Sequence, residues 1–176
     1  EKTSTLLNSN RIIAKQSSKN IYEYIRKTIS DNKSNKFFFN EDYSFSSVEN
    51  EFFYYEDKFG GMKLPIPNLN GQFQLENIST AIATLRNIKQ LKISVNHIKS
   101  GITKIHSIAR LQEITKGKLK DLVKKNRLII DGSHNPLGAK VLNNYLETLN
   151  CDKHIILGMM ANKDHLEFIS YFKNIK

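Results

Sequence analysis

The sequence predicts a mixed α/β fold organised in two parts. In the first part, short aromatic-rich runs separated by Asn, Asp and Ser indicate antiparallel strands, and apolar residues at three- and four-residue steps indicate helices. From Arg110 onward, buried strand-like runs alternate with helical segments, a pattern typical of a parallel sheet with right-handed crossovers. We therefore expect a domain boundary near residues 105–110.

Five runs predict strands in the first part. They are RIIAKQ (11–16), KFFFN (36–40), YSFSSV (43–48), EFFYYED (51–57) and FGGMKLPIP (59–67). The first is expected to be short and buried. The others are expected to form antiparallel strands, with Pro65 and Pro67 ending the series.

Three helices are predicted in the same part. The first covers 19–30, is capped by Ser17 or Ser18, and has an apolar stripe of Ile21, Tyr24, Ile25 and Thr28. The second lies within 68–91 and buries one face through Leu75, Ile78, Ile82, Leu85 and Ile88. The third covers 94–105, with Ser94 as its cap.

The second part predicts strands at 110–114, 127–131 and 154–159, with helices over 136–149 and 164–175. Residues 116–125 are expected to form a basic turn or loop. Three strands are too few for a complete doubly wound sheet. Because the chain also lacks an initiating Met and stops after an amphipathic run, we expect a fragment of a longer protein.

Composition narrows the class of protein. At 39% hydrophobic and 25% charged, the 176 residues are typical of a soluble globular protein, and no apolar run approaches the roughly 18 residues of a membrane span. The single cysteine, Cys151, excludes disulfides and cysteine-rich zinc sites and indicates a reducing compartment. We expect a cytoplasmic protein that does not bind membranes.

The net charge of +10 raises the alternative of nucleic-acid binding. However, Lys and Asn are abundant throughout, and the densest basic run, KGKLKDLVKK (116–125), has no aromatic residues for stacking bases. We therefore expect no nucleic-acid partner.

The stretch DGSHN (131–135) follows a predicted buried strand, where ligands of open α/β sheets bind. Asn135 and Pro136 can begin a helix whose amides and dipole attract a phosphate, and Asp131 can accept hydrogen bonds from ribose hydroxyls. A well-capped turn without a ligand is the alternative, and spacing alone leaves the two open. Capping does not account for Asp131 beside His134.

Three further side chains could serve a nucleotide. The amide of Asn77 can pair with an adenine edge, although an Asn in a first helical turn commonly bonds locally. The guanidinium of Arg110 can grip a phosphate, although a surface salt bridge is the ordinary role. Lys163 faces either the same cleft or water, and Asp164 is a candidate helix cap.

Four segments resemble motifs of one family when taken in order. They are LNGQFQLENISTAIATL (69–85), ARLQEI (109–114), LIIDGSHNPLGAKVL (128–142) and LGMMANKD (157–164). They are similar to the patterns L-x-G-x-H-Q-x-x-N-A, P-G-R-L-Q, D-G-A-H-N-P-x-G-A and G-x-x-x-D-K-D of the folylpolyglutamate synthase/dihydrofolate synthase family, within the Mur ligases. The resemblance covers essentially the whole chain.

This resemblance implies a fold and a division into domains. Residues 1–106 are expected to be the C-terminal part of a Mur-type central ATPase domain. Residues 107–176 are expected to be a truncated, Rossmann-like C-terminal ligase domain.

The resemblance also implies an activity. Family members use ATP to phosphorylate a carboxylate of dihydropteroate or folate, and the amino group of L-glutamate then attacks the acyl phosphate. Asn77 matches the family's nucleotide-contacting asparagine, Arg110 its phosphate-contacting arginine and Asp131 its ribose-contacting aspartate. His134 matches a histidine near the phosphates.

The sequence departs from the family in several places. Phe73 stands where the family has His, residues 107–109 replace W-P-G, and Asn162 replaces the first Asp of D-K-D. No G-x-x-x-x-G-K-[ST] loop is present. In the family, that loop and the Mg²⁺ ligands lie in the N-terminal half of the ATPase domain.

We therefore expect neither catalytic residues nor metal ligands in this chain, and no activity without the missing half. The intact enzyme is expected to be a monomer. Two alternatives remain: a fragment of another Mur-type amide ligase, and a non-catalytic nucleotide-binding remnant of a decayed gene.

Overall fold

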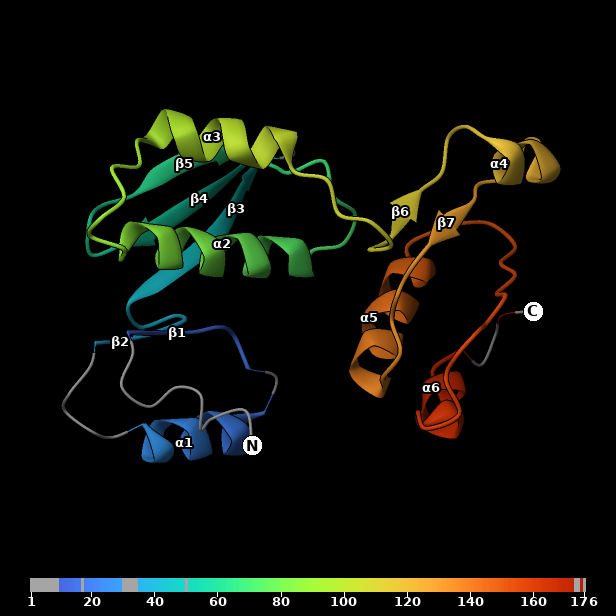
Figure 1. Ribbon diagram of the computed structural model, residues 1–176, viewed down its shortest axis with the longest axis horizontal. Helices are drawn as coiled ribbons and strands as arrows, with labels where there is room; N and C mark the ends of the chain where they lie inside the picture. The colour runs from blue at the N-terminus through green and yellow to red at the C-terminus, as the bar shows by residue number, and fades with distance from the viewer. Residues whose placement is uncertain (1–9, 17, 30–34, 50, 173–174, 176) are drawn as a thin grey trace. The chain divides into compact units, whose positions relative to one another are not determined.

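The computed structural model describes residues 10–16, 18–29, 35–49, 51–172 and 175 (Figure 1). The chain divides into two compact units. Unit 1 comprises residues 1–68 and 74–105, and unit 2 comprises residues 69–73 and 106–176. The fold is mixed α/β, as predicted.

Unit 1 packs two helices on one face of an antiparallel meander (Figure 1). Its elements are β1 (Arg11–Ile13), α1 (Lys19–Thr28), β2 (Lys36–Phe38), β3 (Tyr43–Glu49), β4 (Phe52–Asp57), β5 (Met62–Pro65), α2 (Phe73–Arg86) and α3 (Val95–Lys104). The order β3–β4–β5 confirms the predicted antiparallel strands of this region.

The meander alternates its side chains between core and solvent. Phe53 and Tyr55 of β4 are fully buried, whereas Tyr54 between them is exposed. Phe53 lies opposite Leu64 and Tyr55 opposite Met62 on β5, and both partners are also buried. This period of two is what the aromatic runs predict for a half-buried sheet.

The helices complete this core. Leu75, Ile78 and Ile82 of α2 are buried with residues of α3, which confirms the predicted helical face over these positions. Leu85 and Ile88 are exposed, so the prediction that they belong to the buried face of this helix was wrong. The helix ends at Arg86, and Ile88 lies beyond its last turn.

The predicted cap of α3 is confirmed. The Ser94 hydroxyl accepts a hydrogen bond from the His97 backbone N–H at 3.2 Å, and the His97 ring in turn accepts from the Ser94 N–H at 3.3 Å. This reciprocal arrangement satisfies two amides that the helix itself leaves without partners.

The prediction that 36–40 belongs to the antiparallel series was wrong. β2 pairs with β1 in parallel, with Ile12 opposite Phe37. The chain passes through α1 between the two strands, and a helical crossover returns the chain in the same direction. A small core of Ile13, Ile29 and Phe38 forms there.

The predicted stripe of α1 was wrong in part. Ile21 and Tyr24 are exposed, whereas Tyr22 and Ile25 pack on the small core, with the Tyr22 and Phe38 rings 5.4 Å apart. Ser18 occupies the N-cap position without a side-chain cap bond, and Ser17 lies outside the described residues.

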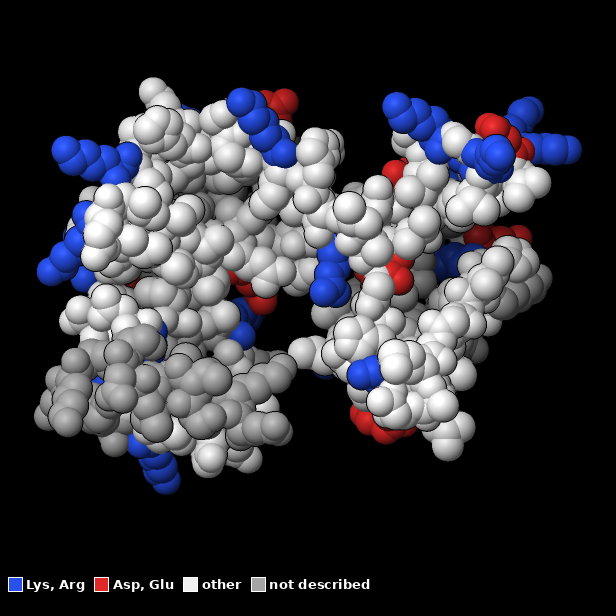
Figure 2. All heavy atoms as spheres, viewed as in Figure 1, with Lys and Arg blue, Asp and Glu red and all other residues white. Residues whose placement is uncertain are grey.

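Unit 2 contains β6 (Gln112–Glu113), α4 (Lys118–Val123), β7 (Ile129–Ile130), α5 (Pro136–Glu147) and α6 (His165–Ser170). α5 confirms the helix predicted over 136–149 up to Glu147. α6 confirms only the first half of the helix predicted over 164–175, because it ends at Ser170 and the described residues 171, 172 and 175 are not helical; residues 173 and 174 lie outside the described residues. The predicted basic loop instead contains the short helix α4, and Figure 2 shows Lys and Arg side chains projecting from this part of unit 2.

The predicted parallel sheet of unit 2 was wrong for the described residues. β6 and β7 pair antiparallel, with Gln112 opposite Ile130, and residues 154–159 form no strand. The Ile156 side chain is fully exposed, so this apolar run has no sheet to join. A single hairpin-like connection through α4 reverses the chain between β6 and β7.

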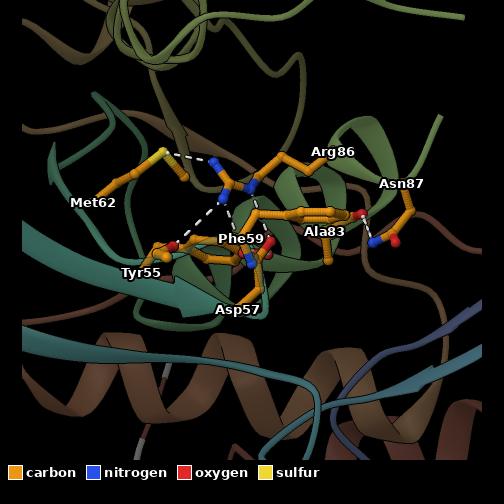
Figure 3. Close-up of polar contacts among 8 residues, drawn as sticks. Tyr55, Asp57, Phe59, Met62, Ala83, Arg86 and Asn87 are labelled. Carbon is orange, nitrogen blue, oxygen red and sulfur yellow. Dashed lines mark hydrogen bonds and ion pairs between the residues drawn. The ribbon is translucent and has the colours of Figure 1, made fainter. Parts of the chain in front are cut away.

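A buried ion pair ties the end of α2 to the β4–β5 hairpin (Figure 3). The Arg86 guanidinium donates from Nε to Asp57 Oδ2 at 2.8 Å and from Nη2 to Oδ1 at 2.9 Å. The Tyr55 hydroxyl donates to Oδ2 at 3.0 Å and the Phe59 N–H to Oδ1 at 2.8 Å. Burial, reinforced by the Asp57 charge, raises the pKa of Tyr55 and keeps it a neutral donor.

Replacing Arg86 with Ala leaves the Asp57 carboxylate, only 2% exposed, without its counter-charge. We expect the free energy of unfolding of unit 1 to fall by about 3–5 kcal/mol. Urea unfolding with hydrogen exchange read over residues 51–65 measures this loss.

Lys15→Ala is the matched control, because it breaks an ion pair with Glu76 in the same unit that is 50% and 31% exposed. Its expected cost is below about 1 kcal/mol. Similar losses for the two variants would contradict a special role for the buried pair.

Candidate functional site

Three segments of unit 2 meet around Arg110. They are residues 69–73, the stretch 109–111, which we call the Arg110 turn, and residues 131–135, which we call the DGSHN loop. The Gly132 N–H donates to the Ala109 carbonyl at 2.8 Å, and the Asn70 Nδ2 donates to the Leu111 carbonyl at 2.8 Å. Segments that lie 20 or more residues apart in the sequence thus share one hydrogen-bonded structure.

The DGSHN loop begins α5 as the sequence predicts. The Asn135 side chain accepts from the Gly138 N–H at 2.8 Å, and Pro136 occupies the first turn. A side chain at Gly138 would have no room, because its Cβ would lie 2.9 Å from the Ser133 side chain. The first turn of α5 therefore packs closely against the Ser133 side chain at the end of the loop.

Gly132 serves the loop in a way that the sequence did not predict. Its φ is not in the left-handed region, so the turn itself does not require glycine. A Cβ there would lie 3.3 Å from the Ala109 carbonyl oxygen, to which the Gly132 N–H donates. The glycine permits close approach of two backbones.

Asp131 is half-buried and holds two backbone amides at once. Its Oδ2 accepts from the Leu111 N–H at 2.8 Å and its Oδ1 from the Ser133 N–H at 2.8 Å. Each carboxylate oxygen has further acceptor capacity, so two hydrogen bonds leave room for hydroxyl donors from a ligand. The ribose role stays a prediction that this geometry permits.

Arg110 projects from a turn with an unusual backbone. Ala109 and Leu111 on either side both have left-handed conformations, with φ of 51° and 49°. The Arg110 side chain is exposed, and it forms no ion pair or hydrogen bond with any residue in the part of the chain that the structure describes. The surface salt bridge considered as its ordinary role is thus not seen among these residues.

His134 is exposed at the tip of the loop. Its Nδ1 lies 3.0 Å from the Gly132 carbonyl oxygen, which can only accept, so this contact requires Nδ1 to carry a hydrogen. The neutral ring then presents a lone pair at Nε2. Only the doubly protonated ring donates from Nε2 to a phosphate oxygen.

Asn77 belongs to unit 1, whereas Arg110, Asp131 and His134 belong to unit 2. Asn77 is exposed on α2, and its Nδ2 donates to the Gln74 side chain at 3.4 Å. This contact is the local bond that the sequence raised as the alternative. The Gln74 Nε2 is buried without a partner among the described residues.

The second predicted loop is simpler. Asp164 caps α6 by accepting from the Glu167 N–H at 2.9 Å, which confirms that prediction. Lys163 is half-buried. Within the described ranges, no group of three or more His, Cys, Asp or Glu residues could hold a metal ion, and no helix is long and apolar enough to span a membrane.

Two residues that hold the site together were not predicted from the sequence. Asn70 donates to Leu111, and the Gln112 Oε1 accepts from the Ala109 N–H at 2.9 Å. Both lie inside the segments that resemble the family motifs. However, a polar residue beside a glycine or in a short strand does not reveal from sequence alone which backbone group it bonds. Gln112 bonds three residues away, and Asn70 bonds 41 residues away.

No protein-family model matches the chain, and no curated protein matches it. Solved structures do match. E. coli FolC in complex with DHPP and ADP has 24% identity and a TM-score of 0.72, over 87% of this chain and 34% of that one. An FPGS–AMPPCP–folate complex has 22% identity and a TM-score of 0.73, over 93% and 38%.

A third match is a bifunctional folylpolyglutamate synthase/dihydrofolate synthase with Mn, AMPPNP and L-glutamate bound. It has 22% identity and a TM-score of 0.69, over 85% of this chain and 33% of that one. The chain therefore spans about a third of the length of the structures that it matches. The resemblance noted in the sequence is confirmed at the level of the fold.

Ala109 stands where the related motif has glycine, and its left-handed φ explains that preference. We expect Ala109→Gly to stabilise unit 2 by about 0.5–1 kcal/mol, because relief of the left-handed cost outweighs the lost backbone restriction. Hydrogen exchange over residues 106–172 measures the change.

Ala161→Gly is the control, since Ala161 is exposed in the same unit and is not left-handed. Ala161→Gly is expected to lower the stability of unit 2 slightly or not at all. Destabilisation of unit 2 by Ala109→Gly would contradict the proposed strain.

Proposed function

We propose that these 176 residues are part of an ATP-dependent carbon–nitrogen ligase that adds L-glutamate to folate or dihydropteroate, and that they supply one side of its nucleotide site. The observation that carries the proposal is the hydrogen-bonded junction of the Arg110 turn with the DGSHN loop. The Arg110 guanidinium is exposed on this turn and has no partner among the described residues. The turn is hydrogen-bonded to the DGSHN loop, which leads into the N-terminus of α5. The matched structures are described with ADP, AMPPNP or AMPPCP, which supports a nucleotide as the ligand.

In this proposal, different residues of unit 2 bind the ribose and the phosphates of the nucleotide. Asp131 accepts hydrogen bonds from the ribose hydroxyls, and the Arg110 guanidinium donates to phosphate oxygens. The first-turn amides of α5 and the positive end of its dipole add attraction for the same phosphates, with His134 beside them. For Asn77, which belongs to unit 1, the resemblance alone supports a contact of its amide with an adenine edge.

The chemical step belongs to groups that this sequence lacks. Attack of the substrate carboxylate on the γ-phosphate forms an acyl phosphate and releases ADP; attack of the glutamate amine then forms the amide and releases phosphate. Phosphoryl transfer of this kind depends on a phosphate loop and Mg²⁺. We expect this chain to bind and orient the nucleotide and another segment to supply the phosphate loop, whose sequence pattern is not found in these 176 residues.

The partner that the proposal requires is a polypeptide segment with the phosphate loop and the Mg²⁺ ligands. Together the two form a cytoplasmic enzyme that acts as a monomer.

Asp131→Asn tests the ribose contact. We expect the affinity of the chain for ADP, measured by isothermal titration, to fall by about ten- to a hundredfold, because hydrogen bonds to a charged acceptor are lost. The 2′,3′-dideoxy analogue of ADP has no such hydroxyls, so Asp131→Asn is expected to weaken its binding less than that of ADP; the loss that remains measures the disturbance of the Arg110 turn, to which Asp131 also bonds.

Asp152→Asn is the matched control, because Asp152 is exposed in the same unit and lies outside the loop. It should leave ADP binding unchanged. If Asp131→Asn weakens ADP and the dideoxy analogue equally, Asp131 has no ribose contact.

The isolated chain is expected to incorporate no radiolabelled glutamate into folate or dihydropteroate when ATP and Mg²⁺ are supplied, because it has no phosphate loop. Addition of a polypeptide with the missing half is expected to produce turnover. Turnover by the isolated chain would refute the proposed division of labour.

A further inference from the structure

The Arg110 turn adopts a backbone conformation that its residues do not favour. Ala109 and Leu111 both lie in the left-handed region, and each such residue costs roughly 1–2 kcal/mol unless it is glycine. Strained backbone persists only where the surrounding structure holds it in place. The contacts around the turn therefore indicate what holds it.

Every backbone polar group of Ala109 and Leu111 has a partner within unit 2. The Ala109 N–H donates to Gln112 Oε1 at 2.9 Å, and its carbonyl accepts from the Gly132 N–H at 2.8 Å. The Leu111 N–H donates to Asp131 Oδ2 at 2.8 Å, and its carbonyl accepts from Asn70 Nδ2 at 2.8 Å. The residues on both sides of Arg110 are thus fixed by four hydrogen bonds.

The buried Leu111 side chain also holds the turn in place. It is 1% exposed, and its Cδ1 lies 3.1 Å from the position that a Cβ on Gly71 would occupy. Gly71 itself has a φ of +96°, which glycine alone adopts without strain. The segment with Asn70 and Gly71 therefore packs directly against Leu111, while the Arg110 side chain between the fixed residues is exposed.

We propose that Asn70 is a positioning residue for Arg110. Its amide holds the Leu111 carbonyl, and together with Asp131 it keeps the turn in the conformation that presents the guanidinium to a phosphate-bearing ligand. This inference rests on the proposed nucleotide site. A turn fixed before binding loses less conformational entropy when the phosphate arrives, so Asn70 raises affinity without touching the ligand.

The test is a double-mutant cycle in the full chain, with ADP and adenosine as probes and isothermal titration as the measurement. Asn70→Asp keeps the size of the side chain and removes the donor. We expect it to weaken ADP binding about three- to tenfold and to leave adenosine binding unchanged, because adenosine has no phosphate for Arg110. In an Arg110→Ala background, Asn70→Asp should change ADP affinity less than about twofold, because residues acting through one another are not additive.

Asn150→Asp is the control for the added negative charge, since Asn150 is exposed in the same unit. Backbone chemical shifts of residues 109–111 report the turn itself, and Asn70→Asp should remove their left-handed signature. Asn70→Ala should repeat every effect without adding charge.

The outcomes separate the two proposals. If the unmodified chain binds ADP no more tightly than adenosine, the nucleotide-phosphate site fails and the positioning role falls with it. If the ADP preference is present but Asn70→Asp leaves it or the turn unchanged, the positioning role alone is overturned. If Asn70→Asp weakens the binding of ADP and of adenosine equally, Asn70 has a merely structural role and the positioning role is overturned. The same holds if Asn70→Asp changes ADP affinity equally with and without the Arg110 side chain.

Discussion

The Asp131 carboxylate bonds two backbone amides in different segments, and the arrangement of unit 2 around Arg110 depends on that bridge. One oxygen accepts from Leu111 and the other from Ser133, so the Arg110 turn and the DGSHN loop share a single acid. Charged acceptors form stronger hydrogen bonds than neutral ones. The same group can therefore hold the site together and keep acceptor capacity for a ligand.

The two units are stabilised differently. Unit 1 has an extended apolar core of strand and helix residues, closed at one end by the buried Asp57–Arg86 pair. Among the described residues of unit 2, few large apolar side chains are buried, Leu111 and Phe168 being examples. Side-chain bonds to backbone therefore carry more of the structure of unit 2, and its left-handed residues need those bonds.

Local features could be predicted from the sequence, and long-range ones could not. The caps at Ser94, Asn135 and Asp164 follow from neighbouring residues, and each was predicted. The parallel pairing of β1 with β2 and the antiparallel pairing of β6 with β7 depend on how distant segments meet. An apolar run such as 154–159 has strand character but becomes a strand only beside a partner.

The same distinction bears on what a motif means. The segments that carry the resemblance, around residues 69–73, 109–113 and 131–135, are the ones that bond to one another in unit 2. Asn70, Gly71 and Gln112 therefore have structural reasons for their identity, and their presence alone does not argue for a ligand. Arg110 differs, because its side chain is exposed and has no partner among the described residues. The left-handed backbone on both sides of this exposed cation costs free energy that the surrounding hydrogen bonds offset. The proposed binding of an anion at Arg110 would give a reason for a turn of this conformation at this position.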